Sequence, residues 1–119
     1  MSNCPDAIGL QQIGAATLEE FDRRVANIPQ DLCAPFHHEA GRLETELLTI
    51  YKFVAMGARN EQDLAAVAAS WKLMVEMCDD AARRLAELNQ QHPACGADIY
   101  FDRMLDLRNK CERLKKMHH

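Results

Sequence analysis

Apolar residues recur every three or four positions along most of the chain, which is the spacing of one face of an α-helix. The clearest such stripe consists of Phe36, Ala40, Leu43, Leu47, Ile50 and Val54. No stretch alternates apolar and polar residues in the way of a half-buried β-strand. Alanine and leucine are common and β-branched residues are scarce, which also favours helix over strand. The pattern therefore predicts an all-α fold.

The N-terminal residues break this pattern, and we expect an irregular arm over residues 1–16, with a frayed short helix as the alternative. Proline and glycine are poor helix formers, and the arm contains Pro5, Gly9 and Gly14. Thr17 and Glu20 then have the spacing of a capping box, in which each side chain bonds a free backbone N–H of the first helical turn. These signals predict a short first helix over Leu18–Ile28, which ends before Pro29 because a proline ring clashes with a continuing helix.

Three longer helices are predicted over residues 35–56, over residues 61–91 and from residues 96–98 to the C-terminus. Gly57 suits the left-handed conformation that ends many helices, and Asn60 suits the cap of the next helix. We therefore expect a tight turn over Gly57–Asn60, and a link this short makes the two flanking helices antiparallel neighbours. The sequence thus predicts an up-down antiparallel helical bundle of three long helices plus a shorter N-terminal helix, in a single domain over residues 17–119.

Composition and charge narrow the possible functions. Of the 119 residues, 48% are hydrophobic and 27% are charged, which is the balance of an ordinary globular domain. Asp and Glu outnumber Lys and Arg by 18 to 14, whereas nucleic-acid binders are usually basic, so we expect no nucleic-acid partner. The longest apolar runs, such as residues 64–69, are far shorter than a membrane span, and no secretory signal pattern is present. We therefore expect a cytoplasmic protein without a membrane partner.

The cysteine and histidine residues offer one candidate metal site. Five cysteines at irregular spacing, without a CxxC pair, do not resemble a secreted disulfide framework, so we expect reduced thiols. In an up-down bundle the first and third connections lie at the same end. This brings together four possible zinc ligands, which are Cys33, His37, His92 and Cys95. His38 cannot point inward together with His37, and free thiols with solvated histidines are the alternative interpretation of the cluster.

Catalytic motifs are absent from the sequence. Ser2 and Ser70 are its only serines, neither lies in a nucleophile-elbow pattern, and no glycine-rich phosphate-binding loop is present. Cys33 or Cys95 could pair with a histidine as an activated thiolate, but such a nucleophile also needs an orienting third group that the sequence does not reveal. We therefore do not expect an enzyme.

The third predicted helix has more apolar surface than one core stripe requires. Its stripe consists of Leu64, Val67, Ala68, Trp71, Met74, Val75 and Cys78. Apolar positions beside this stripe are Ala66, Ala69, Leu73 and Met77. A helix that is apolar nearly all round is buried nearly all round, either in its own bundle or against another chain. We expect these four additional residues to form the interface of a two-fold homodimer.

These patterns leave three functional hypotheses open. The first is a small helical-bundle protein that acts by protein-protein interaction and self-associates. The second is a metal- or redox-sensing module that uses the Cys/His cluster, with zinc as its cofactor. The third is a small-ligand binder whose apolar cavity is formed by Tyr51, Trp71, Met74 and Tyr100.

Overall fold

Helices make up nearly all of the computed structural model, which describes residues 7–29, 32–57 and 64–117. Its elements are α1 (Ala7–Ala26), α2 (Cys33–Gly57), α3 (Leu64–Gln91), the short 3-10 helix η2 (Pro93–Cys95) and α4 (Ala97–Met117). No β-strand occurs within the described ranges. The predicted all-α fold is therefore confirmed.

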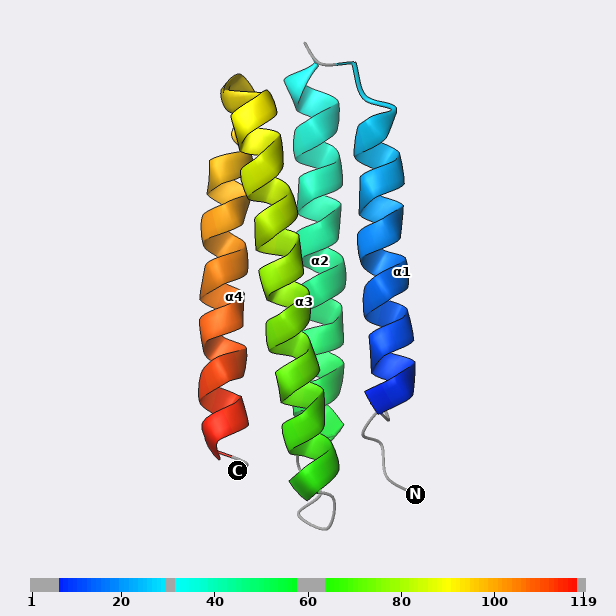
Figure 1. Ribbon diagram of the computed structural model, residues 1–119, viewed down its shortest axis with the longest axis vertical. Coiled ribbons are helices and arrows are strands. Elements are labelled where there is room, and N and C mark those ends of the chain that lie inside the picture. The colour runs from blue at the N-terminus through cyan, green and yellow to red at the C-terminus, as the bar shows by residue number, and fades with distance from the viewer. Residues whose placement is uncertain (1–6, 30–31, 58–63, 118–119) are drawn as a thin grey trace.

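The α-helices run side by side along the long axis of the molecule, which measures 51 × 22 × 16 Å (Figure 1). Each α-helix runs opposite to the one before it, as the predicted up-down antiparallel bundle requires. The most extensive packing is between α3 and α4, and α1 packs on both α2 and α3. Because the direction alternates, the end of α1, the start of α2, the end of α3 and the start of α4 meet at one end, uppermost in Figure 1.

The apolar stripes form a single core between the helices. On α2 every residue of the predicted stripe is buried, namely Phe36, Ala40, Leu43, Leu47, Ile50 and Val54. The residues of α3 that are fully shielded from solvent include Val67, Trp71, Met74 and Cys78. From α4 the core receives Met104, Leu107 and Cys111. Removal of these stripes from water is what holds the helices together.

The N-terminal helix is longer than predicted. It begins at Ala7 rather than at Leu18, and it ends at Ala26 rather than at Ile28. The irregular arm predicted over residues 1–16 is therefore wrong for residues 7–16, while residues 1–6 lie outside the described part of the chain. The predicted turn over Gly57–Asn60 also falls outside it beyond Gly57, the last residue of α2.

Tertiary contacts explain why the glycine-containing part of α1 is helical. Leu10 is fully buried, and the backbone at Gly14 lies close against α3. A Cβ atom at position 14 would be 2.5 Å from the Sδ atom of Met77. Glycine leaves room for this approach, and the packing that it allows outweighs a helix-propensity cost of about 1 kcal/mol.

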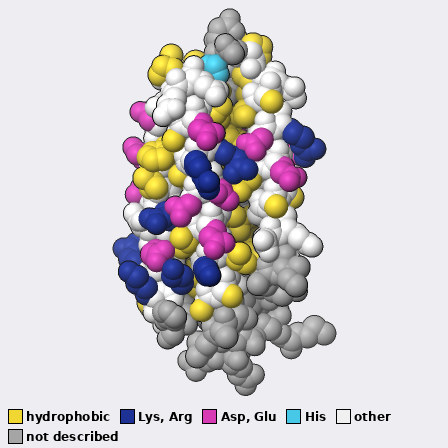
Figure 2. Space-filling model, viewed as in Figure 1, with side chains coloured by type: hydrophobic (Ala, Val, Ile, Leu, Met, Phe, Trp, Pro, Cys, Tyr) yellow, Lys and Arg dark blue, Asp and Glu magenta, His cyan; other side chains and the backbone are white. Residues whose placement is uncertain are grey.

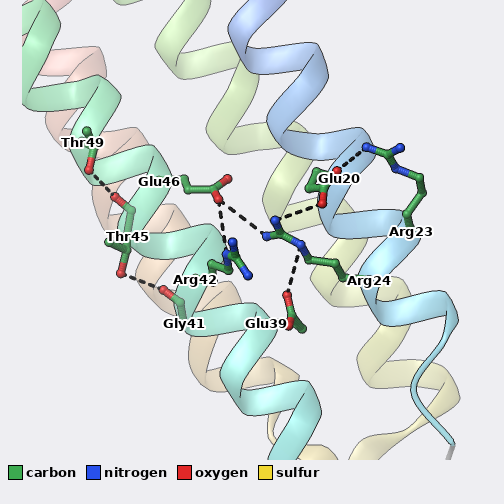
Figure 3. A network of polar contacts seen from close by, with 9 residues as sticks. All are labelled: Glu20, Arg23, Arg24, Glu39, Gly41, Arg42, Thr45, Glu46 and Thr49. Atoms are coloured by element: carbon green, nitrogen blue, oxygen red, sulfur yellow. Dashed lines mark hydrogen bonds and ion pairs between the residues drawn. The ribbon is translucent and has the colours of Figure 1, made fainter.

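Ion pairs add to the apolar contacts that hold α1 in place. Arg24 of α1 lies 3.7 Å from Glu39 and 3.6 Å from Glu46, both on α2 (Figure 3). Asp22, also on α1, has both carboxylate oxygens 3.0 Å from the Nε atom of Arg84 on α3. Each partly exposed pair contributes only about 0–1 kcal/mol to stability. Their main effect is to fix the orientation of α1 against its two neighbours.

The outer surface carries charges of both signs. Figure 2 shows Lys and Arg side chains interspersed with Asp and Glu on this face, with hydrophobic side chains visible between them. The whole chain has a net charge of −4. The face in view is therefore unlike the uniformly basic surface that is typical of nucleic-acid binding.

Replacing two helical glycines by alanine should have opposite effects on stability. An added Cβ at Gly41 on α2 meets nothing within 4 Å, so Gly41→Ala should raise the free energy of unfolding through helix propensity. The expected gain is about 0.5–1 kcal/mol. Gly14→Ala sets its Cβ against Met77 and should lower the free energy of unfolding by about 1–3 kcal/mol. Urea unfolding followed by circular dichroism measures both changes.

The Met77→Ala background is the control for this steric effect. Without the Met77 side chain, Gly14→Ala should become neutral or stabilising, because only the gain in helix propensity remains. An equal loss of stability in both backgrounds would show that Gly14 does not lie against Met77.

Candidate functional site

Two cysteines far apart in the sequence meet at the uppermost end of the bundle in Figure 1. Cys33 is the first residue of α2, and Cys95 is the last residue of η2. Their Sγ atoms lie 2.7 Å apart, and both residues are free thiols. Cys33 is partly exposed, with its Sγ 3.7 Å from the backbone oxygen of Ala94, whereas Cys95 is buried. The prediction that Cys33 and Cys95 lie at the same end is confirmed.

The turn between α3 and α4 places Cys95 in this position. Pro93 begins η2, and the backbone N–H of Cys95 donates to the carbonyl of His92 at 3.1 Å. Gly96 then adopts a φ of 78°, a left-handed conformation that lets the chain reverse into α4. A Cβ atom at Gly96 would lie 3.1 Å from the Cε1 atom of His37, so the imidazole packs directly on this turn.

His37 lies one helical turn after Cys33 and contacts Tyr100 of α4. Its Nδ1 atom is 3.2 Å from the hydroxyl of Tyr100, which donates to the backbone oxygen of His37 at 3.4 Å. The guanidinium of Arg103 lies 5.3 Å from the centre of the Tyr100 ring and 3.3 Å from Glu44. These contacts join α2 to α4 beside the thiol pair, and they direct His37 Nδ1 to Tyr100.

The structure does not gather the four predicted zinc ligands into one cluster. Within residues 7–29, 32–57 and 64–117, no group of three or more His, Cys, Asp or Glu side chains is placed to hold a metal ion. Cys33 contacts Cys95, His37 bonds Tyr100, and His92 lies in the wall of a neighbouring groove. Zinc binding stays a prediction, whereas the cysteine pair is an observed feature.

The two thiols of the pair are not equivalent. The hydrogen bond with Cys33, and after it burial, raises the pKa of Cys95 above its ordinary value. The raised pKa favours the protonated form of Cys95, and either sulfur can be the donor in the contact. Cys33 is the more exposed residue of the pair.

A groove of about 330 Å³ opens beside the pair, between the end of α1, the start of α2 and the end of α3. Most of its lining is apolar and includes Val25, Ile28, Leu32, Phe36 and Leu88. Cys95 forms part of the same wall. A groove of this size and character is at the lower end of the range for small-molecule sites. Sequence reasoning missed it, because it depends on how α1 ends against two other helices.

Sequence reasoning also missed a second thiol pair, which lies in the core. Cys78 of α3 and Cys111 of α4 are both fully buried. A hydrogen bond with Cys111, followed by burial, raises the pKa of Cys78 far above its ordinary value. The available signal was that both cysteines lie in the stripes of adjacent antiparallel helices, at similar distances from η2 in the sequence. The four cysteines of the described residues therefore form two pairs, one with a partly exposed member and one that is fully buried.

The predicted dimer interface on α3 is wrong for Met77. This side chain is only 6% exposed, because α1 covers it at Gly14. An irregular arm over residues 1–16 would leave this face uncovered, whereas the helical α1 shields it. Ala69 and Leu73 are partly buried, and the side chain of Ala66 is not among those described. Self-association as a homodimer stays a prediction, with less apolar surface to support it.

The apolar cavity predicted from Tyr51, Trp71, Met74 and Tyr100 is not formed. Trp71 and Met74 are fully buried, and the ring of Tyr51 packs 5.5 Å from that of Trp71. Tyr100 instead lies beside His37, which is about four turns, or about 20 Å, from Tyr51 along α2. Tyr100 therefore cannot share a cavity with the other three residues.

No protein-family model, curated protein or solved structure matches the chain. Among the helices of the described residues, none combines the length and apolar character needed to cross a membrane. Function is therefore inferred from the chemistry of the site itself.

Alkylation of Cys95 should require a higher pH than alkylation of an ordinary cysteine. The thiolate is the reactive form, and the pKa of Cys95 is raised. Cys33→Ala removes the hydrogen bond and should shift the pH profile of Cys95 back toward lower pH, leaving the effect of burial. Timed reaction with iodoacetamide, followed by peptide mass spectrometry, measures the profile. The same profile in both proteins would mean that the two thiols are not in contact.

Met77→Glu should unfold the bundle rather than dissociate a dimer. It buries an unpaired carboxylate beneath α1, at a cost on the order of 3 kcal/mol or more. Leu73→Glu, at a partly buried position of the same helix, is the matched comparison and should cost less. Circular dichroism and light scattering report folding and mass. A folded Met77→Glu variant that loses only self-association would restore Met77 to the interface.

Proposed function

We propose that the protein is a thiol redox module, in which Cys33 and Cys95 interconvert between two thiols and one disulfide. The observation that supports this function is the contact of their Sγ atoms at 2.7 Å. A disulfide has its sulfurs about 2.05 Å apart, so the two Sγ atoms already lie near bonding distance. This is the redox form of the sensing module considered from the sequence.

The reaction with a low-molecular-weight disulfide begins at Cys33. Its thiolate attacks one sulfur of the oxidant, which releases one thiolate and leaves a mixed disulfide on Cys33. Cys95 then loses its proton to solvent and attacks the Cys33 sulfur, which displaces the second thiolate. Two protein thiols give up two electrons and two protons, and the oxidant becomes two thiols. The exposure of Cys33 and the shielding of Cys95 match this order of attack.

Oxidation would change the stability of the bundle. The two cysteines are separated by 62 positions in the sequence, so a disulfide between them closes a long loop. By the chain-entropy relation such a loop stabilises the folded state by about 4 kcal/mol. It would also fasten the start of α2 to the turn before α4. Formation of the disulfide would thereby make this end of the bundle more rigid.

Equilibration in glutathione buffers of increasing oxidised fraction tests this function. Intact mass spectrometry should show the loss of two hydrogens, peptide mapping should place the disulfide at Cys33–Cys95, and thermal unfolding should move upward. Cys33→Ser and Cys95→Ser should each abolish all three changes. The matched control is the Cys78→Ala/Cys111→Ala double variant, which removes the other cysteine pair and should keep them.

Three outcomes would overturn the proposal. The first is that no intramolecular disulfide forms at any glutathione ratio. The second is a disulfide that involves the core pair instead. The third is stoichiometric zinc in protein purified without added metal, bound so that it blocks oxidation, which would favour the metal-sensing alternative at Cys33 and Cys95.

A further inference from the structure

The groove beside Cys95 gives small molecules a second route of approach to the thiol pair. Cys33 is reached from solvent, whereas Cys95 belongs to the wall of the groove. We propose that the groove binds a small thiol with an apolar body, and that this thiol reduces the Cys33–Cys95 disulfide by attacking Cys95. This inference rests on the proposed redox function and names the class of reductant that serves it.

The lining of the groove selects for an apolar body. Val25 near the end of α1, Ile28 just after it, and Leu88 of α3 belong to the lining, and Leu32 and Phe36 complete the apolar surface. The volume of about 330 Å³ is about eleven times the share of one water molecule in the liquid. This is ample space for a ring-sized or short branched group.

The polar residues of the lining are compatible with binding of an apolar group in the groove. Asp22 is held by Arg84, with both of its carboxylate oxygens 3.0 Å from the guanidinium Nε atom. Its charge is therefore already partnered. Gln91 is the last residue of α3 and His92 follows it, close in sequence to Cys95, where they can bond the polar end of a ligand. A ligand whose apolar group lies among the apolar residues, and whose sulfur lies toward Cys95, matches both the apolar and the polar parts of the lining.

The chemistry of the step assigns the leaving group. The reductant thiol loses its proton to solvent, and its thiolate attacks the Cys95 sulfur. The Cys33–Cys95 bond breaks, a mixed disulfide forms on Cys95, and Cys33 leaves as a thiolate. A second molecule of the thiol attacks the first, which releases a small disulfide and returns Cys95 as a thiol.

Reduction rates of the oxidised protein by two probes test the proposal. Benzyl mercaptan supplies an apolar ring, and mercaptoethanol supplies a small polar body. Each rate is divided by the rate with which the same thiol reduces oxidised glutathione, which corrects for intrinsic reactivity. The corrected rate should be about tenfold higher for benzyl mercaptan, because burial of a ring-sized apolar group is worth at least one power of ten. Peptide mass spectrometry of acid-quenched samples should place the benzyl adduct on Cys95.

A matched pair of surface variants locates the effect. Leu32 in the groove and Ile13 on α1 are each 47% exposed, so both accept a glutamate without burial of charge. Leu32→Glu places a carboxylate at the groove and should remove most of the preference for benzyl mercaptan. Ile13→Glu lies outside the groove lining and should leave the preference unchanged.

The outcomes separate this inference from the function on which it rests. If the disulfide forms in glutathione buffers but the two corrected rates are equal, the redox function stands and the groove is not a reductant site. A benzyl adduct found on Cys33, or an equal loss of preference in both variants, also overturns the inference. Failure of the disulfide to form at all overturns the redox function itself.

Discussion

The site at the uppermost end of the bundle depends on one backbone reversal, at Gly96. The φ of 78° there turns the chain from η2 into α4, and the absence of a side chain leaves room for the ring of His37. Three consequences follow from this single turn. Cys95, the residue before Gly96, is held against the start of α2. Tyr100, one helical turn after Gly96, contacts His37. Helix α4 then runs back along α3 in the register that pairs Cys111 with Cys78. The partly exposed and the buried thiol pairs are thus both set by the same reversal.

Much of the fold could be predicted from the sequence, because it depends on periodicity and on helix breakers. The stripe from Phe36 to Val54 is buried as its spacing indicates. The alternation of direction, inferred from short connections, was enough to bring Cys33 and Cys95 to one end. The contact between their sulfurs could not be obtained in this way, since it depends on the path of the chain through η2. The contact between His37 and Tyr100 could not be predicted either. Helical spacing indicates the face on which a residue lies, but it does not indicate the side-chain rotamer or the contact partner.

The extension of α1 shows why the remainder escaped prediction. Gly9 and Gly14 lower helix propensity, and a reading residue by residue makes this segment irregular. In the structure the lack of a side chain at Gly14 is what allows the helix to approach Met77. A glycine that weakens an isolated helix strengthens a packed one, and that distinction depends on a residue far away in the chain. The same omission left the face of α3 around Met77 uncovered in the predicted interface. One missing helix segment therefore accounts for the error about that surface.

The buried Cys78–Cys111 pair can report whether a protein molecule has opened. These sulfurs lie between α3 and α4, the most extensive helix contact in the bundle, and they meet a reagent only when that contact opens. Cys33, in contrast, is partly exposed in the native state. Modification of the core pair would therefore mark a molecule whose α3–α4 contact has opened at least once, whereas modification of Cys33 requires no such opening.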